Sequence, residues 1–302
     1  MADATSLITR PRPAFGLQAA IATARPRQWL KNGLVLAALV YAGRLTTTGD
    51  VARAGLAFLV FCLISSSGYV LNDVVDAASD TNHPFKRSRP IPAGTLGTRE
   101  ALIFGSSMAL AGLAVALALG PAFEAVSAAY LALSALYSVI LKHRAGLDIL
   151  TICGLFELRA LAGAVAIGVA ESIWLAVMTA LLAAFLVVGK RRAELGVFGL
   201  NSAGARRSLQ GYSTVILDGL TAVVAVGAAA CYCAYCLLAR GLPPHHLMLP
   251  TLPFVVVGLA RYARLTGPGM RGPEDGFLRD RLLLIDVAMW AVLTAGLLYW
   301  AR

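Results

Sequence analysis

A group of carboxylates closes the second long apolar stretch of this chain. Asn72, Asp76 and Asp80 are spaced i, i+4, i+8, and Asp73, Asp76 and Asp80 are spaced i, i+3, i+7. On a helix, either set of three lies along one face. Like charges this close repel one another, and carboxylates near a membrane boundary are costly to bury. A divalent cation relieves both penalties, and ligands that are all oxygen favour Mg²⁺ or Mn²⁺ over zinc. The alternative is a chance acidic cluster at a solvated helix end, which the cost of carboxylates at this depth disfavours.

A basic loop follows the acidic group. Lys86 and Arg89 come within ten residues of Asp80, and the prolines and glycine of segment 83–94 rule out a continuous helix there. A metal ion beside Lys and Arg suits a diphosphate, because the cation bridges some oxygens while the bases bind the rest. For Arg87 the tendency of basic residues to lie on the cytoplasmic side of a membrane is a sufficient explanation.

The elements that position these residues are membrane helices. The 302 residues are 58% hydrophobic and 14% charged, whereas a soluble domain is about 45–50% apolar and about 25% charged. This composition excludes a soluble globule and a disordered chain. The apolar residues fall in runs of helix-spanning length, which predicts an all-α polytopic membrane protein. We expect one domain over 1–302, with 1–28 as a cytoplasmic or interfacial segment.

Nine transmembrane spans are predicted from the apolar runs. They are about 29–45, 52–79, 100–120, 122–141, 147–169, 172–189, 213–239, 247–263 and 282–301. With the N-terminus in the cytoplasm, most basic residues fall on that side, and those expected on the other side are Arg44, Arg53, Arg240 and Arg302. This asymmetry predicts a cytoplasmic N-terminus and explains the net charge of +10 without a nucleic-acid partner.

The pattern NDxxDxxxDxxxxxKxxRPxxxG, from Asn72 to Gly94, resembles the UbiA superfamily of intramembrane prenyltransferases. The resemblance implies a bundle of nine helices around a cavity that opens to the cytoplasm. It also implies that Asn72, Asp76 and Asp80 hold Mg²⁺ on a diphosphate, with Asp73 as a close neighbour. Asp73, Asp76 and Asp80 are accordingly the candidate catalytic residues.

The segment after the sixth span departs from the aromatic prenyltransferases of that superfamily, which carry a second aspartate-rich motif there. Here it reads Lys190-Arg191-Arg192-Ala193-Glu194. Bases in place of acids suggest that an anionic group is bound directly. This departure resembles the polyprenyl-phosphate (decaprenyl-phosphate) phosphoribosyltransferases of cell-wall arabinan synthesis, as do segments 25–32, 142–143, 158–163, 207–212, 261–262 and 273–281. The resemblance implies 5-phosphoribosyl 1-diphosphate as donor and a polyprenyl phosphate as acceptor.

Further side chains are candidates for binding these anionic substrates. Arg159 lies inside the fifth span, where a phosphate contact is favoured over a packing pair with Glu157. Lys142 is either a phosphate ligand or an interfacial anchor, and Lys31 is either a ligand or part of an interfacial belt around Trp29. For Asp148, Asp218 and Asp286, a position near a helix start is a sufficient explanation. The full set of substrate-binding candidates is Lys31, Lys86, Arg89, Tyr137, Lys142, Arg159, Lys190 and Arg191.

The predicted reaction is substitution at the anomeric carbon of ribose. The lipid phosphate attacks with inversion, and Asp73 either holds a ribose hydroxyl or stabilises oxocarbenium character. The plasma membrane is the expected location, and a homo-oligomer is compatible with this plan. One alternative is an aromatic prenyltransferase that uses a polyprenyl diphosphate, against which the basic second motif argues. Another is a solute transporter, but no inverted repeat is evident and the polar groups crowd one membrane boundary.

Overall fold

The computed structural model describes residues 16–81, 86–198, 207–239, 242–243, 246–266 and 280–300. Every regular element in these residues is helical. The α-helices are α1 (Leu17–Ala24), α2 (Ala37–Tyr41), α3 (Thr48–Asp80), α4 (Thr98–Ala116), α5 (Pro121–Val139), α6 (Leu147–Ala166), α7 (Ile173–Phe198), α8 (Thr214–Leu238), α9 (Leu252–Leu265) and α11 (Arg281–Trp300). The 3₁₀ segments are η1 (Pro26–Leu36), η2 (Lys86–Ser88), η3 (Leu117–Leu119), η4 (Leu141–His143), η5 (Arg207–Gly211) and η6 (Leu249–Thr251).

Seven of the described helices are long and apolar enough to cross a membrane. They are 48–80, 98–119, 121–139, 147–166, 173–196, 214–238 and 281–299. The predicted span 29–45 instead falls on η1 and α2, because Gly33 and the polar residues of segment 27–32 interrupt its apolar run. The predicted span 247–263 falls on η6 and the 14-residue α9, whose start is set by prolines. The all-α membrane architecture is confirmed, and the count of nine stays a prediction, as does the single domain.

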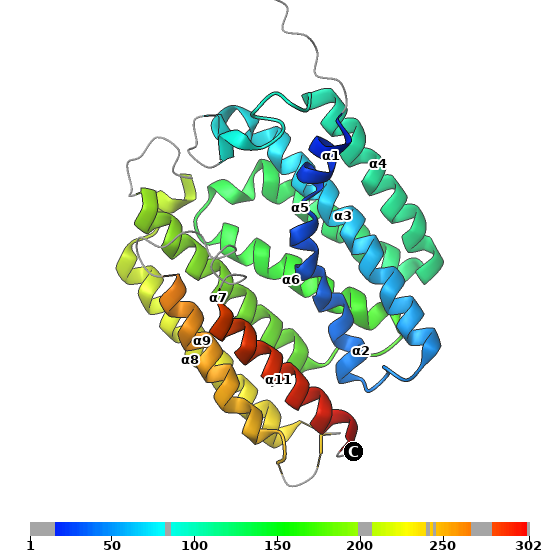
Figure 1. The fold of residues 1–302 in the computed structure, drawn as a ribbon, viewed down its shortest axis with the longest axis vertical. Helices are drawn as coiled ribbons and strands as arrows, with labels where there is room; N and C mark the ends of the chain where they lie inside the picture. The colour runs from blue at the N-terminus through cyan, green and yellow to red at the C-terminus, as the bar shows by residue number, and fades with distance from the viewer. Residues whose placement is uncertain are drawn as a thin grey trace, which may run out of the picture.

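The helices form two neighbouring groups. Helix α3 packs against α4 and α5, and α7 packs against α8, while contacts between α6 and α7 join the groups. Figure 1 shows α7, α8, α9 and α11 side by side on one flank and α3 with α4 on the other. The first group has a core around Phe61, whose ring lies 5.2 Å from that of Tyr130. The second group has a core that includes Phe185 and Tyr262, with ring centroids 5.3 Å apart.

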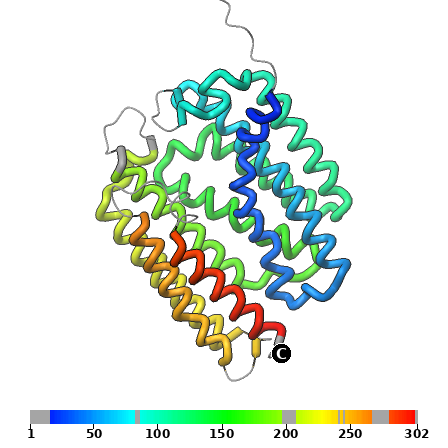
Figure 2. The backbone as a smooth tube through the Cα atoms, viewed as in Figure 1, coloured from blue at the N-terminus to red at the C-terminus, as the bar shows by residue number. Residues whose placement is uncertain are grey.

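The N-terminal segment η1 packs along the first group, with Asn32 and Val35 buried and Pro26, Arg27 and Leu30 exposed. Segment η1 contacts both α3 and α6, and Figure 2 shows it running alongside α3. Gly163 of α6 makes this approach possible, because a Cβ there would lie 2.0 Å from the backbone oxygen of Val35. Arg25, directly before this segment, forms an ion pair with Asp73 of α3, and Asn32 within the segment donates to Ser65 of the same helix.

Candidate functional site

The carboxylates at the end of α3 are each paired with a cation of this chain. Asp76 receives the ammonium of Lys142 at 2.5 Å, and the same ammonium lies 3.3 Å from Asn72 Oδ1. Asn72 Nδ2 also donates to Asp76 Oδ2 at 3.1 Å. Lys142 comes from η4 and is 1% exposed, whereas Asn72 and Asp76 are half-buried. The two oxygen ligands thus converge on one cationic point.

Asp73 and Asp80 are buried and share a second set of cations. Arg89 donates to Asp73 at 3.1 Å and to Asp80 at 2.7 Å. Arg25 forms an ion pair with Asp73. Lys86 lies 3.6 Å from Asp80. Because every buried carboxylate here has a cation, the repulsion expected among the acids is balanced within the chain itself.

The arrangement of Asn72 and Asp76 suits a divalent cation. The third predicted ligand, Asp80, is not oriented toward them. Their oxygens already surround the ammonium of Lys142, so a metal ion that displaced this ammonium would have two oxygen ligands in place. Asp80 turns instead toward Lys86 and Arg89. Among the described residues, no three His, Cys, Asp or Glu side chains are gathered closely enough for a metal site. In this arrangement Asp80 needs to exchange partners before it can serve as a ligand.

Arg25 was not among the predicted site residues, although it belongs to one of the segments that carry the resemblance. It sits between α1 and η1 with φ 53°, a left-handed conformation that costs a non-glycine residue about 1–2 kcal/mol. Its guanidinium lies 5.5 Å from the centre of the Tyr69 ring. The strained residue is the one whose side chain binds Asp73. Because backbone strain is concentrated at functional sites, this coincidence indicates that Arg25 has a role in the site.

Arg159 lies inside the bundle and all three of its nitrogen groups have partners. It donates to Asn32 Oδ1 at 2.9 Å, to the Tyr130 hydroxyl at 2.6 Å and to the Leu155 carbonyl at 2.8 Å. The guanidinium also stacks over the Tyr130 ring at 4.7 Å. Asn32 in turn donates to Ser65 Oγ of α3. The partners of Arg159 differ from the packing pair with Glu157, and the geometry favours a role in holding η1, α3, α5 and α6 together. The phosphate contact stays a prediction.

Arg191 occupies a closed cluster at the junction of α6 and α7. It is 1% exposed and donates to Asp148 at 2.7 Å and to Glu194 at 2.6 Å, with the Tyr137 hydroxyl at 3.5 Å. Asp148 is 0% exposed and also accepts from the Tyr212 hydroxyl at 2.7 Å. Helix-dipole complementarity alone does not account for Asp148, since it is the buried partner of an arginine. The geometry favours Arg191 as a positioning residue in place of the predicted phosphate contact.

Tyr212 completes this cluster from the start of α8. Its hydroxyl donates to Asp148 and accepts from the backbone amide of Gly146 at 2.6 Å. Burial, together with the nearby Asp148 carboxylate, raises the pKa of Tyr212 to about 12, so the hydroxyl remains a donor at neutral pH. Sequence spacing alone could not find this contact, because Asp148 and Tyr212 are far apart in the chain.

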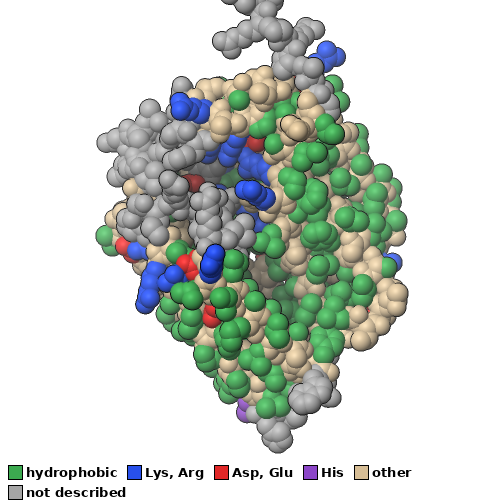
Figure 3. All heavy atoms as spheres, in the orientation of Figure 1, with side chains coloured by type: hydrophobic (Ala, Val, Ile, Leu, Met, Phe, Trp, Pro, Cys, Tyr) green, Lys and Arg blue, Asp and Glu red, His purple; other side chains and the backbone are tan. Residues whose placement is uncertain are grey.

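The remaining predicted residues are neither fully buried nor exposed. Lys31, Tyr137 and Lys190 are half-buried. Figure 3 shows Lys and Arg side chains gathered in a hollow on one face, with hydrophobic side chains covering the surface beside and below it. His83 and Pro84, which belong to the predicted loop motif, lie outside the described residues.

The sequence and the fold were compared with those of known proteins. The model of the UbiA prenyltransferase family matches residues 33–272. The chain is 34% identical over 295 residues to a decaprenyl-phosphate phosphoribosyltransferase of Mycobacterium tuberculosis, covering 96% of this chain and 97% of that protein. It is 33% identical over 319 residues to the protein of the same name from Mycolicibacterium smegmatis, covering 99% and 100%. Its fold is similar to that of a UbiA homolog from Archaeoglobus fulgidus bound to GPP and Mg²⁺, with a TM-score of 0.73, 15% identity and coverage of 93% and 99%.

Proposed function

Because this chain belongs to the UbiA prenyltransferase family, we propose that it transfers 5-phosphoribose from 5-phosphoribosyl 1-diphosphate to a polyprenyl phosphate of the decaprenyl class. The observation that carries the proposal is similarity to decaprenyl-phosphate phosphoribosyltransferases over almost the whole chain. The basic surroundings of the acids agree with it, since donor and acceptor together bring three phosphate-bearing groups. The protein is thus a membrane-integral transferase. In the proposed reaction, diphosphate leaves the anomeric carbon of the donor as a single group.

Asn72 and Asp76 would hold the metal ion, for which Mg²⁺ is the proposal. When bound, Mg²⁺ supplies positive charge to the departing diphosphate. The UbiA homolog of known structure that binds GPP also binds Mg²⁺, which supports the use of a divalent cation in this family. With a metal ion on this pair of ligands, Lys142 would be available to bind a phosphate oxygen, which supports the first of its two predicted roles over that of an interfacial anchor.

Lys86 and Arg89 are placed to bind the same diphosphate from the loop beside Asp80. Arg25 and Arg89 hold Asp73 as a fixed carboxylate, in position for a ribose hydroxyl or for positive charge that develops at the anomeric carbon. The acceptor phosphate is ionised at neutral pH and needs no strong base. The residues therefore act by positioning and by charge stabilisation, and attack opposite the leaving group gives inversion.

Lys190 and Lys31 are the proposed rim contacts for the phosphate groups of donor and acceptor, while Arg159 and Arg191 position the helices that carry the site. We place the polar site on the cytoplasmic side of the plasma membrane, on the asymmetry of basic residues in the sequence. A free phosphorylated sugar is supplied from water, and the acceptor is supplied by the bilayer, so a site at this boundary reaches both.

The test uses membranes that contain the protein, Mg²⁺, radiolabelled 5-phosphoribosyl 1-diphosphate and decaprenyl phosphate. Label is expected in the organic phase, in a lipid that mild acid cleaves to phosphoribose. A parallel reaction offers a polyprenyl diphosphate and an aromatic acid. Prenyl transfer in the second reaction without labelled lipid in the first would overturn the proposal in favour of the aromatic prenyltransferase alternative.

A further inference from the structure

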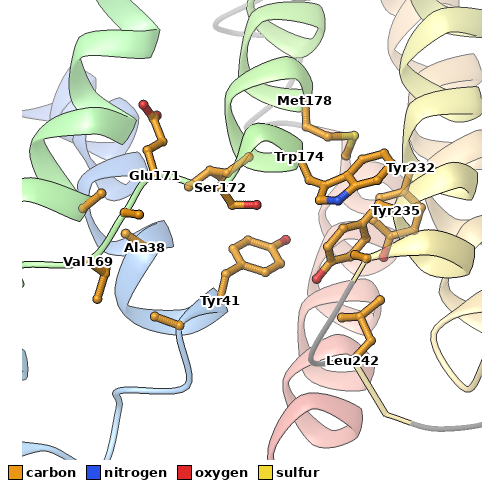
Figure 4. A pocket seen from close by; sticks show the side chains of 15 residues that line it. Ala38, Tyr41, Val169, Glu171, Ser172, Trp174, Met178, Tyr232, Tyr235 and Leu242 are labelled. Atoms are coloured by element: carbon orange, nitrogen blue, oxygen red, sulfur yellow. The ribbon is translucent and has the colours of Figure 1, made fainter.

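A cavity lies away from the carboxylates, between α2, the α6–α7 connection, α7 and α8. It measures about 230 Å³, and its wall includes Tyr41, Trp174, Met178, Tyr232 and Tyr235. Figure 4 shows these side chains arranged around one open space, with Leu242 at its edge. A cavity with such a wall suits an apolar ligand.

This cavity stands at the opposite end of the bundle from the acids. Helix α7 carries Trp174 at its start and Lys190 sixteen residues later, a rise of about 24 Å. Helix α8 carries Tyr235 near its end, whereas Tyr212, just before the helix, reaches the cluster of Asp148. The N-terminal segment repeats this order, since Arg25 begins it and Tyr41 ends it. Three segments thus run from the polar site to the aromatic cavity.

The rings of the cavity pack against one another, and hydrogen bonds hold the hydroxyl of Tyr232. The Tyr235 ring lies 6.1 Å from that of Tyr41, 6.2 Å from that of Trp174 and 6.0 Å from that of Tyr232. The Tyr232 hydroxyl is bonded to Thr251 at 2.6 Å and accepts from the indole of Trp290 at 2.9 Å. The wall therefore presents ring faces and edges to the space, together with the hydroxyl of Tyr41 (Figure 4).

Glu171 is the acidic residue of this wall. Its carboxylate points away from Tyr41 and the other rings in Figure 4, and burial raises the pKa of Glu171. Among the described residues that line the cavity none is Lys or Arg, so the wall offers no cation to an anionic headgroup and suits a hydrocarbon chain.

We propose that the cavity receives the far end of the polyprenyl chain of the acceptor and so selects for chain length. This inference rests on the proposed function, which puts the acceptor phosphate at the polar end. The bilayer core is about 30 Å thick, so a long polyprenyl chain that leaves the polar site and stays against the bundle covers the 24 Å or so to the rings. Its methyl branches then pack between aromatic faces, where each buried methylene strengthens binding about fourfold.

The test compares transfer to decaprenyl phosphate with transfer to a three-isoprene phosphate. Ala42→Phe fills the cavity from a half-buried position, and we expect it to lower kcat/KM for the long acceptor by at least about tenfold while the short acceptor changes less than about twofold. Ala114→Phe, on the exposed face of α4, is the matched control and should change neither. Equal losses for both acceptors, or none for either, overturn the inference.

A second measurement does not depend on any variant folding well. A decaprenyl phosphate with a diazirine at its far end is crosslinked to the wild-type protein, and the labelled peptides are identified. Label on the peptides of Tyr41, Trp174 or Tyr235 is expected. Label confined to lipid-facing helices such as α4 contradicts the inference, while transfer to the three-isoprene acceptor by the same preparation shows that the proposed function stands.

Discussion

Two clusters of this protein combine the same residue types and differ in their access to ligands. At the end of α3, the half-buried Asp76 meets Lys142, which is 1% exposed, while the cations of Asp80, Lys86 and Arg89, are partly open to solvent with side chains 34% and 26% exposed. At the junction of α6 and α7, Arg191 and Asp148 are 1% and 0% exposed and Tyr212 closes the set. Ion pairs that reach solvent exchange partners readily, whereas a buried pair pays a full desolvation penalty when it is broken. We infer that the first cluster binds substrate and the second fixes the helices around it.

Loss of the open cluster should have the largest effect on activity. Asp76→Asn removes a proposed metal ligand and the partner of Lys142, and we expect transfer to fall by at least about 100-fold with the fold intact. Chelation with EDTA should stop the wild-type reaction, and added Mg²⁺ should restore it. Asp50→Asn, at the other end of the same helix, is the control. Normal turnover by Asp76→Asn at ordinary Mg²⁺ would remove the metal proposal.

Loss of the closed cluster should appear in stability first. Arg191→Met leaves Asp148 buried without its cation and should cost about 3–5 kcal/mol. The matched variant Lys86→Met removes a cation that is 34% exposed and leaves Asp80 paired with Arg89, so it should cost about 1 kcal/mol or less. Thermal unfolding of both proteins in detergent measures the difference. Equal destabilisation by the two variants would erase the distinction between open and closed clusters.

The strained position of Arg25 gives a finer comparison. Arg25→Gly and Arg25→Ala both remove a cation from Asp73, and each should lower kcat/KM by about tenfold. Glycine also relieves the left-handed backbone, so the glycine variant should be about 1 kcal/mol more stable than the alanine variant. Unfolding and steady-state kinetics check the two effects separately. If both variants keep full activity, Arg25 has no part in the site.

The smallest effect is expected at the rim of the open cluster. Lys190→Ala should raise the KM for donor or acceptor by up to about tenfold and leave kcat unchanged, because a rim cation binds ground state and transition state alike. Arg87→Ala, on the exposed η2, serves as the control. Unchanged kinetics for Lys190→Ala would leave that residue a role in membrane topology alone.

Much of this plan could be predicted from local patterns. The apolar run 52–79 corresponds to α3 at Thr48–Asp80, with the acids at its end, and the resemblance to the UbiA superfamily is confirmed. Lys86 and Arg89 contact Asp80 because they follow it by only six and nine residues, which keeps their side chains close to the end of α3. The apolar run 29–45 corresponds to the shorter segments η1 and α2, because Lys31, Asn32 and Gly33 interrupt it, and the side chain of Asn32 is buried against α3.

The partners of the buried arginines could not be predicted. Arg159 bonds to Asn32 and Arg191 to Asp148 across the bundle, and such contacts depend on how helices cross rather than on spacing within one helix. An arginine in a membrane span predicts function by default. Here it indicates a polar link between helices, a distinction that only the packing reveals.

Metal binding tests the open cluster most directly. Binding of Mn²⁺ to the purified protein is followed by electron paramagnetic resonance, with and without 5-phosphoribosyl 1-diphosphate, in the wild type and in Asp76→Asn. The account predicts that the wild type binds Mn²⁺ more tightly with the donor than without it, and that Asp76→Asn loses this gain. Equal binding by the two proteins in the presence of donor would contradict it.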